Sequence, residues 1–326
     1  MDTPMQRSQL SRHNSLTRAL IILAAIVVGI LFFAPAPLDA KGPSNPHTVL
    51  SNRGARWNAA HSDVNSFSSF VANAAPLNQS EDAAEAAQPA RLLAPRNPGS
   101  VIGADNRTRV QDMGAFPFRA IAFVQTEFPG GFYLECTGFL IGEHTVATAG
   151  HCVYSPGLGW AHAARVMPAV NGAVQTFGVA TGNEFFAVAG WVNNMEPEYD
   201  YGAIQLNQDI GKKTGWLGMA NLDNSMLDRA AVSVTGYPAD HPYRTMWTMT
   251  SSLRRVTATR LYYNIDTYAG QSGSPIYNAR FTRACGYCVV GIHGYGTAAD
   301  PRGKLNSGVR MTSAVLDNFI AWRNMP

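Results

Sequence analysis

A serine stands in a glycine-rich turn near the C-terminal end of the chain, in the segment Gly270-Gln271-Ser272-Gly273-Ser274-Pro275. A serine hydroxyl is a poor nucleophile at neutral pH, so it needs a base to accept its proton. The oxyanion that its attack on a carbonyl creates needs donors already in place, and the N–H groups of Gly270 and Ser272 are the natural candidates. Because Gly/Ser turns also connect strands without any catalytic role, this segment alone decides nothing.

A histidine and an acid elsewhere in the chain could complete the catalytic set. His151 ends the small-residue run Val146-Ala147-Thr148-Ala149-Gly150, and Asp200 precedes the apolar segment Tyr201-Gly202-Ala203-Ile204. An imidazole can accept the serine proton, while a carboxylate fixes the imidazole tautomer and stabilises the imidazolium. The chain order His151, Asp200, Ser272 is that of chymotrypsin-like enzymes and excludes the subtilisin and α/β-hydrolase orders. We therefore predict that these three residues form a catalytic triad.

The composition of the chain predicts an all-β fold to position these residues. Of 326 residues, 46% are hydrophobic and only 14% are charged, with 30 glycines and 19 prolines. Short β-branched and aromatic runs begin after Ser100, as at 118–126, 231–237 and 261–267, separated by turn signals such as Pro129-Gly130-Gly131. Many short strands at this spacing indicate a β-barrel or a sandwich. A formal net charge of +3 does not suggest nucleic acid as a partner.

One helix is expected, at the C-terminal end of the chain. Thr312 or Ser313 can cap its first turn. The apolar residues Val315, Leu316, Phe319 and Ile320 repeat on one helical face, which would pack against the barrels.

The N-terminal third of the chain predicts export and processing. Three arginines precede an apolar run at 19–33, and a Pro/Ala stretch ends at Ala40, so residues 1–40 are interpreted as a secretory signal peptide. The alternative, a membrane anchor, is disfavoured because the run is shorter than the roughly 18 residues that span a bilayer. We expect a secreted protein without stable membrane insertion. Residues 41–99, poor in large apolar side chains, are predicted to be a weakly ordered pro-segment.

The motifs around His151 and Ser272 resemble those of bacterial chymotrypsin-like serine proteases. The nearer similarity is to the secreted glutamyl endopeptidases of Bacillus, and a more distant one is to the staphylococcal glutamyl endopeptidase. Further segments that carry it are Ser100-Val101-Ile102-Gly103 with Asp105, Arg107-Thr108-Arg109-Val110, the run 199–204, and Asp266-Thr267-Tyr268-Ala269-Gly270. The resemblance covers most of residues 100–326. It implies a protease domain of two six-stranded antiparallel β-barrels with the active site between them. We expect a monomer that needs no cofactor or metal.

Four cysteines are arranged in two pairs. By similarity to the family, Cys136 and Cys152 would form a disulfide beside the histidine; closing a loop of about 15 residues is worth roughly 3 kcal/mol. Cys285 and Cys288 form a C-x-x-C motif, for which a redox or zinc site is the alternative. Zinc would require two further ligands, so a short structural disulfide is the preferred interpretation.

The specificity pocket carries two conflicting signals. Asp266 lies six residues before Ser272, the spacing at which trypsin keeps the acid that selects basic side chains. His293, in a strand followed by Gly296, could instead bind a substrate carboxylate through a positive or hydrogen-bonding imidazole, and Thr267 would add a hydroxyl donor. By resemblance, Thr267, His293 and Gly296 belong to the pocket of a glutamyl endopeptidase, while Asp266 is satisfied elsewhere. Ala269 stands where these relatives have glycine.

The predicted activity is endopeptidase cleavage of proteins and peptides after Glu, less well after Asp. Cleavage after Lys or Arg through Asp266 is the alternative, and a catalytically silent binding protein on the same scaffold is a second one. Neither Gly99 nor Ser100 is acidic, so a Glu-specific enzyme could not release its own pro-segment there efficiently. We therefore expect a zymogen that needs a separate activating protease.

Overall fold

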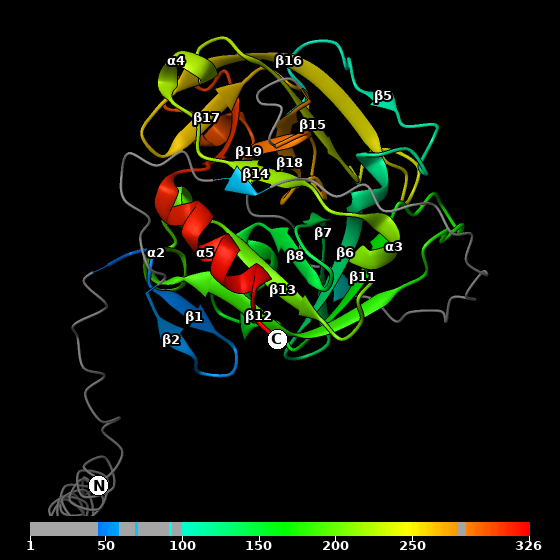
Figure 1. Ribbon diagram of the computed structural model, residues 1–326. Helices are drawn as coiled ribbons and strands as arrows, with labels where there is room; N and C mark the ends of the chain where they lie inside the picture. The colour runs from blue at the N-terminus through cyan, green and yellow to red at the C-terminus, as the bar shows by residue number, and fades with distance from the viewer. Residues whose placement is uncertain (1–44, 59–68, 71–90, 93–99, 280–284) are drawn as a thin grey trace, which may run out of the picture. The chain divides into compact units, whose positions relative to one another are not determined.

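The computed structural model describes residues 45–58, 69–70, 91–92, 100–279 and 285–326 (Figure 1). The predicted signal peptide, residues 1–40, lies outside this part of the chain, as does most of the predicted pro-segment. No helix among the described residues is long and apolar enough to cross a membrane.

Six antiparallel strands close the first barrel, and β12 pairs back with β11 to complete the ring. Their order is β11 (Ala163–Pro168), β6 (Ile121–Phe128), β7 (Phe132–Leu140), β8 (Thr145–Thr148), β13 (Gly202–Leu206) and β12 (Ala180–Val188). Side chains alternate between the two faces of a strand. In β6, Ala122 and Val124 therefore fill the barrel, while Ile121 and Phe123 face a second cluster between the barrels.

A second ring of six antiparallel strands follows along the chain and closes through the pairing of β18 with β19. Its order is β18 (Pro275–Asn278), β15 (Ala231–Gly236), β16 (Trp247–Val256), β17 (Arg260–Tyr263), β20 (Asn306–Arg310) and β19 (Cys288–Tyr295). Val232, Leu261 and Ile276 are fully buried inside it. The predicted fold, two six-stranded antiparallel barrels, is confirmed.

The C-terminal helix α5 (Ser313–Arg323) packs on the first barrel. Its N-cap is Thr312, whose hydroxyl accepts a hydrogen bond from the Val315 N–H at 3.4 Å. Phe319 and Trp322 are fully buried, whereas Ile320, expected on the same face, is half-buried. The helix thus continues its buried face one turn further than the sequence pattern indicated.

Shorter elements connect the barrel strands or flank them. These are β5 (Thr108–Arg109), η1 (Phe118–Ala120), η2 (Gly150–Cys152), β9 (Tyr154–Ser155), β10 (Gly159–Trp160), α2 (Ala189–Asn194), η3 (Pro197–Tyr199), α3 (Gly211–Thr214), β14 (Gly218–Ala220), α4 (Asn224–Leu227) and η4 (Thr297–Ala299). Among them, η2 contains His151, and η3 ends directly before Asp200.

Parts of the predicted pro-segment pair with both sheets. The strands β1 (Val49–Ser51) and β2 (Arg56–Trp57) form a hairpin on the first barrel, where β1 pairs with β12. The two-residue strands β3 (Ser69–Phe70) and β4 (Arg91–Leu92) pair with β14 and β7. Composition indicated weak order here, but backbone pairing with a neighbouring strand does not depend on large apolar side chains.

Candidate active site

His151 and Asp200 are held together by two hydrogen bonds. The His151 backbone N–H donates to Asp200 Oδ1 at 2.7 Å, and His151 Nδ1 lies 2.7 Å from Asp200 Oδ2. Gly150 permits this approach, since a Cβ there would lie 2.9 Å from a Trp191 side-chain carbon and 3.0 Å from Asp200 Oδ1. Because the carboxylate accepts the proton on Nδ1, Nε2 of His151 is left unprotonated and able to act as a base.

Asp200 stays ionised although it is fully buried. Burial alone would raise the pKa of its carboxyl group. The electrostatic interaction with His151, the hydrogen bonds from its two N–H groups and the Tyr295 hydroxyl together hold the pKa below its ordinary value. The acid therefore carries a negative charge beside the imidazole at neutral pH, as an orienting carboxylate must.

Ser272 lies in a turn that contacts both barrels. Thr137 of β7 donates its N–H to Ser272 O at 2.8 Å, and Gly273 donates its N–H to His293 O at 2.8 Å. Gly273 has a φ of 86°, and a Cβ there would lie 3.0 Å from Ala149 N. The serine turn therefore packs against the segment that leads into His151.

The turn before Ser272 presents two backbone donors. Ala269 O accepts a hydrogen bond from the Ala239 N–H at 2.7 Å. In a trans peptide the N–H points opposite to the carbonyl, so the Gly270 N–H is directed away from Ala239. Within the described part of the chain, neither Gly270 N–H nor Ser272 N–H has a protein hydrogen-bond partner. This is the arrangement that an oxyanion hole requires.

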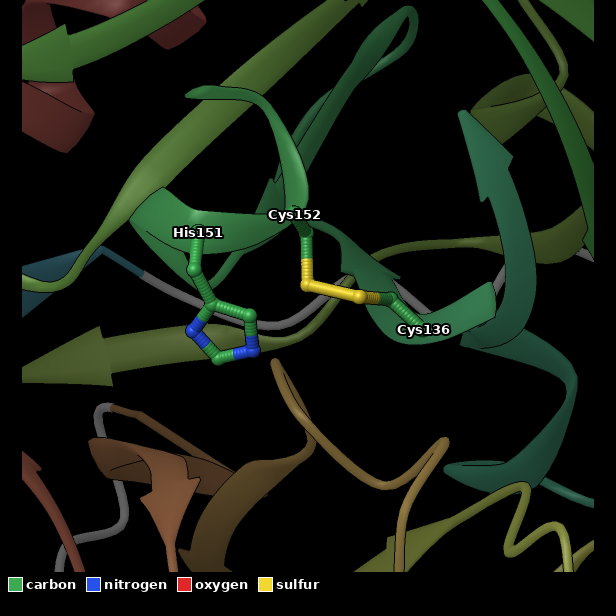
Figure 2. Close-up of side chains that lie close together, drawn as sticks. All are labelled: Cys136, His151 and Cys152. Carbon is green, nitrogen blue, oxygen red and sulfur yellow. A yellow bond between two sulfur atoms is a disulfide. The ribbon is translucent and has the colours of Figure 1, made fainter. Parts of the chain in front are cut away.

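A disulfide lies beside the histidine, as Figure 2 shows. Cys136 and Cys152 are bonded across 16 residues of sequence. A second disulfide joins Cys285 to Cys288. The C-x-x-C motif therefore has both sulfurs bonded to each other, and in this form it offers zinc no thiolate ligands.

Thr267 and His293, predicted to line the specificity pocket, are both buried. Thr267 Oγ1 has no hydrogen-bond partner among the described residues. His293 Nδ1 lies 2.7 Å from the Tyr263 hydroxyl. Burial lowers the pKa of His293 to about 3, with nearby His151 acting in the same direction. The imidazole is therefore neutral, and it also hydrogen-bonds the Ser307 backbone.

The carboxylate of Asp266 accepts hydrogen bonds from the segment that begins at Ser100. The Ile102 N–H donates to Asp266 Oδ1 at 2.7 Å, and the Asn106 N–H donates to Oδ2 at 2.9 Å. The side chain is only 1% exposed. Both oxygens thus already have donors.

The start of that segment lies against the expected pocket walls. Ser100 O accepts hydrogen bonds from the Thr267 N–H at 3.2 Å and from Asn306 Nδ2 at 2.6 Å. The Ser100 hydroxyl lies 3.0 Å from that of Thr297, the residue after Gly296.

The model of the trypsin family matches residues 105–316. The chain belongs to the trypsin family. Glutamyl endopeptidase of Bacillus licheniformis is 32% identical to it over 310 residues, which are 91% of this chain and 95% of that protein. A protein of Bacillus subtilis named as an extracellular metalloprotease is 33% identical over 307 residues, 93% of this chain and 95% of that protein. A solved structure of a Glu endopeptidase in complex with MPD superposes with a TM-score of 0.61 at 29% identity, covering 69% of this chain and all of that one.

This member of the trypsin family is a serine endopeptidase of the chymotrypsin-like fold. Two residues of its site lie outside the sequence prediction. Tyr295 places its ring centroid 6.4 Å from that of His151 and its hydroxyl beside Asp200, whose pKa it helps to lower. The Tyr263 hydroxyl lies 2.7 Å from Nδ1 of His293. The pairing of their strands, β17 and β19, in the second barrel brings both residues to the site. The local sequence carries no signal for either role.

Proposed function

We propose that this protein cleaves peptide bonds through an acyl-enzyme formed on Ser272. Ser272 Oγ attacks the scissile carbonyl while His151 Nε2 takes its proton, and Asp200 stabilises the resulting imidazolium. The N–H groups of Gly270 and Ser272 bind the oxyanion. His151 then protonates the leaving amine, and water releases the acyl group by the same steps. The short hydrogen bonds between His151 and Asp200 support these roles.

We propose that the enzyme prefers Glu as the residue before the cut. The main support for this preference is the hydrogen bonding of Asp266. Both of its oxygens accept backbone N–H groups, so it is poorly placed to bind a Lys or Arg side chain. Next to it, the Thr267 hydroxyl is buried without a partner, and a substrate carboxylate would supply one. His293, which resemblance assigns to the same pocket, lies buried in strand β19. The name of the Bacillus licheniformis relative, glutamyl endopeptidase, supports the same preference.

Maturation would bring a positive charge to this pocket. We propose that residues 41–99 are a pro-segment and that a separate protease cuts beside Ser100. Because Ser100 already contacts Thr267 and Thr297, the new α-amino group on Ser100 or Val101 would lie near the substrate carboxylate. We further propose that the enzyme is exported by its N-terminal signal, as the name of the Bacillus subtilis relative suggests for that protein.

The name of that relative also raises the question of a metal, which the side chains here do not fit. Three clusters of His, Cys, Asp and Glu side chains occur among the described residues. The sulfurs beside His151 form a disulfide. The second cluster, Asp105 and Asp240 with His241, already pairs with Arg107 at 2.8 and 2.6 Å. In the third, Lys212 bridges Glu143 and Asp209 at 3.1 and 2.6 Å, so we assign no step to a metal.

A peptide panel differing only in the residue before the cut (Glu, Asp, Arg or Phe) tests the proposed specificity. We expect the mature enzyme to cleave the Glu peptide best and the Asp peptide second. Cleavage after Arg but not Glu would contradict the assignment of the pocket. Absence of cleavage of every peptide by fully processed protein would favour the silent scaffold.

Expression of the wild-type and Ser272→Ala precursors in a protease-free host tests the proposed activation. We expect both to keep their N-terminal segments, since neither Gly99 nor Ser100 is acidic. Processing of the wild type alone beside Ser100 would show that the enzyme activates itself.

A further inference from the structure

The hairpin of β1 and β2 adds a strand to the first barrel. Figure 1 shows it beside β12, where Val49 pairs with Val188 and Ser51 with Phe186. The ring closes through residues 180–182 of β12, which pair with β11. Residues 186–188 extend past this closure, so on that side they have no partner strand within the barrel. An unpaired edge is a template for an added strand.

Further backbone bonds extend this pairing beyond the strand. The N–H of Ala189 donates to Thr48 O, and the N–H of Gly190 donates to Pro46 O, each at 2.9 Å. The hairpin therefore follows the chain from β12 into helix α2.

Apolar contacts fix the hairpin on this edge. Val49 is fully buried and belongs to the same cluster as Phe186 and Trp322. The Trp57 ring meets that of Phe186 edge to face, with centroids 5.9 Å apart. By contrast, Arg56 on the same hairpin is exposed, so the hairpin has one face for the barrel and one for solvent.

The hairpin also contacts the residues on either side of Asp200. His47 Nδ1 lies 2.8 Å from the Tyr201 hydroxyl, and the His47 ring packs edge to face on Tyr199 with centroids 5.0 Å apart. Asn318 of α5 donates from Nδ2 to His47 O at 3.0 Å and to the Tyr201 hydroxyl at 2.8 Å. The hairpin thus braces the segment that carries the buried acid.

None of these contacts involves the chain near Ser100, so a cut there would leave all of them in place. We infer that the free edge of β12, together with Tyr199, Tyr201 and Asn318, is a docking surface for the hairpin 45–58, which stays bound non-covalently after the chain is cut beside Ser100. That the mature enzyme carries this bound hairpin rests on the proposed maturation cut. The docking surface itself does not depend on substrate specificity.

The test uses the full-length Ser272→Ala chain with residues 93–99 replaced by the recognition sequence of an unrelated, sequence-specific protease. After cutting in native buffer, size-exclusion chromatography and intact-mass measurement determine whether the N-terminal fragment elutes with residues 100–326. We expect one-to-one coelution, and protection of the Ala189 and Gly190 amides, which donate to Thr48 and Pro46, from hydrogen exchange as strong as in the uncut chain.

Two substitutions identify the surface responsible. Val49→Asp places an unpaired charge in the buried contact and should release most of the fragment, whereas the matched control Arg56→Gln should retain it. If Val49→Asp prevents folding, the double substitution His47→Ala with Asn318→Ala removes hydrogen bonds without burying a charge. It should speed fragment loss after dilution by at least about tenfold, as expected for losing more than 1.4 kcal/mol of binding free energy.

Dissociation of the fragment from a folded 100–326 portion in native buffer would overturn the inference. Coelution that survives both Val49→Asp and the double substitution would also overturn it, because other contacts would then hold the fragment. Since Ser272→Ala and a foreign protease replace the enzyme's own chemistry, an error in the proposed specificity or activation would leave these results unchanged.

Discussion

Thr267 and Asp266 are neighbours in sequence with different surroundings in the pocket. Asp266 accepts N–H groups from Ile102 and Asn106 on its two oxygens, and these donors offset its negative charge. Thr267 Oγ1 is buried with no partner, so a ligand that accepts a hydrogen bond removes an unfavourable state. An incoming carboxylate therefore gains a donor here, whereas an incoming ammonium would compete with the backbone N–H groups that already bond both oxygens of Asp266.

Thr267→Val should separate substrate recognition from catalysis. Valine keeps the shape of threonine and removes only the hydroxyl, and a hydrogen bond to a charged group is worth about 1.5–3 kcal/mol. We expect kcat/KM for a peptide with Glu before the cut to fall about 10- to 100-fold, with little change for a Phe peptide. Thr250→Val, at an exposed position of β16, is the control. An equal loss on both peptides would show a general structural effect.

His293 should make the protein less stable in acid. Its pKa is lowered from 6.5 to about 3 by burial, so below about pH 6.5 the unfolded state binds more protons than the folded one. This costs up to about 1.4 kcal/mol per pH unit as the pH falls through the window between the two pKa values. Urea unfolding of wild type and His293→Gln at pH 7 and pH 4.5 measures the difference. The variant should lose less unfolding free energy than wild type between pH 7 and pH 4.5. An equal loss in both proteins would contradict the assignment of His293 as neutral.

At the scale of elements, the turn between β17 and β18 is held by groups from outside both strands. Ala239 N–H binds Ala269 O at 2.7 Å, and Thr137 Oγ1 donates to Gly270 O at 2.8 Å. Gly270 itself has a φ of 91°, which glycine adopts without strain. The orientation of the Gly270 and Ser272 N–H groups, the proposed oxyanion donors, is therefore set by the packing of this turn against β7 and the segment after β15.

Gly270→Ala should disable the turn. A Cβ there would lie 2.4 Å from Tyr237 O, so the turn must shift and the N–H donor moves with it. Losing one oxyanion donor costs about 100- to 1000-fold in kcat, and KM should change much less. Gly303→Ala is a matched control, since Gly303 also has a positive φ, of 64°, but nothing within 4 Å of the added carbon. If the two variants have similar kcat, the turn does not form the oxyanion site.

At the scale of the whole molecule, the residues of the proposed site come from both barrels. His151 and Asp200 follow strands of the first, Ser272 and His293 belong to the second, and an apolar cluster that includes Phe139 of the first and Val309 of the second lies between them. The fold could be predicted from short alternating strands and from motif resemblance, which do not require long-range contacts. The prediction of triad residues needed only their types and chain order.

The contacts that tune the site could not be predicted in this way. Tyr295 reaches Asp200 and Ala239 reaches Ala269 because distant segments meet in the fold, and nothing in their local sequence marks those roles. The hairpin at 45–58 was missed for a similar reason. Its composition lacks a large apolar run, but Val49 meets an edge of β12 whose free backbone groups are invisible to composition.

Peptidyl phosphonates, which trap an activated serine covalently, test the central claim most directly. Two probes that differ only in carrying a Glu or a Lys side chain before the reactive phosphorus are incubated with the mature enzyme, and the adduct is located by peptide mass mapping. We predict one adduct, on Ser272, that forms faster with the Glu probe and is absent in His151→Ala. An adduct on another residue, or one that forms only with the Lys probe, would contradict this account of the site.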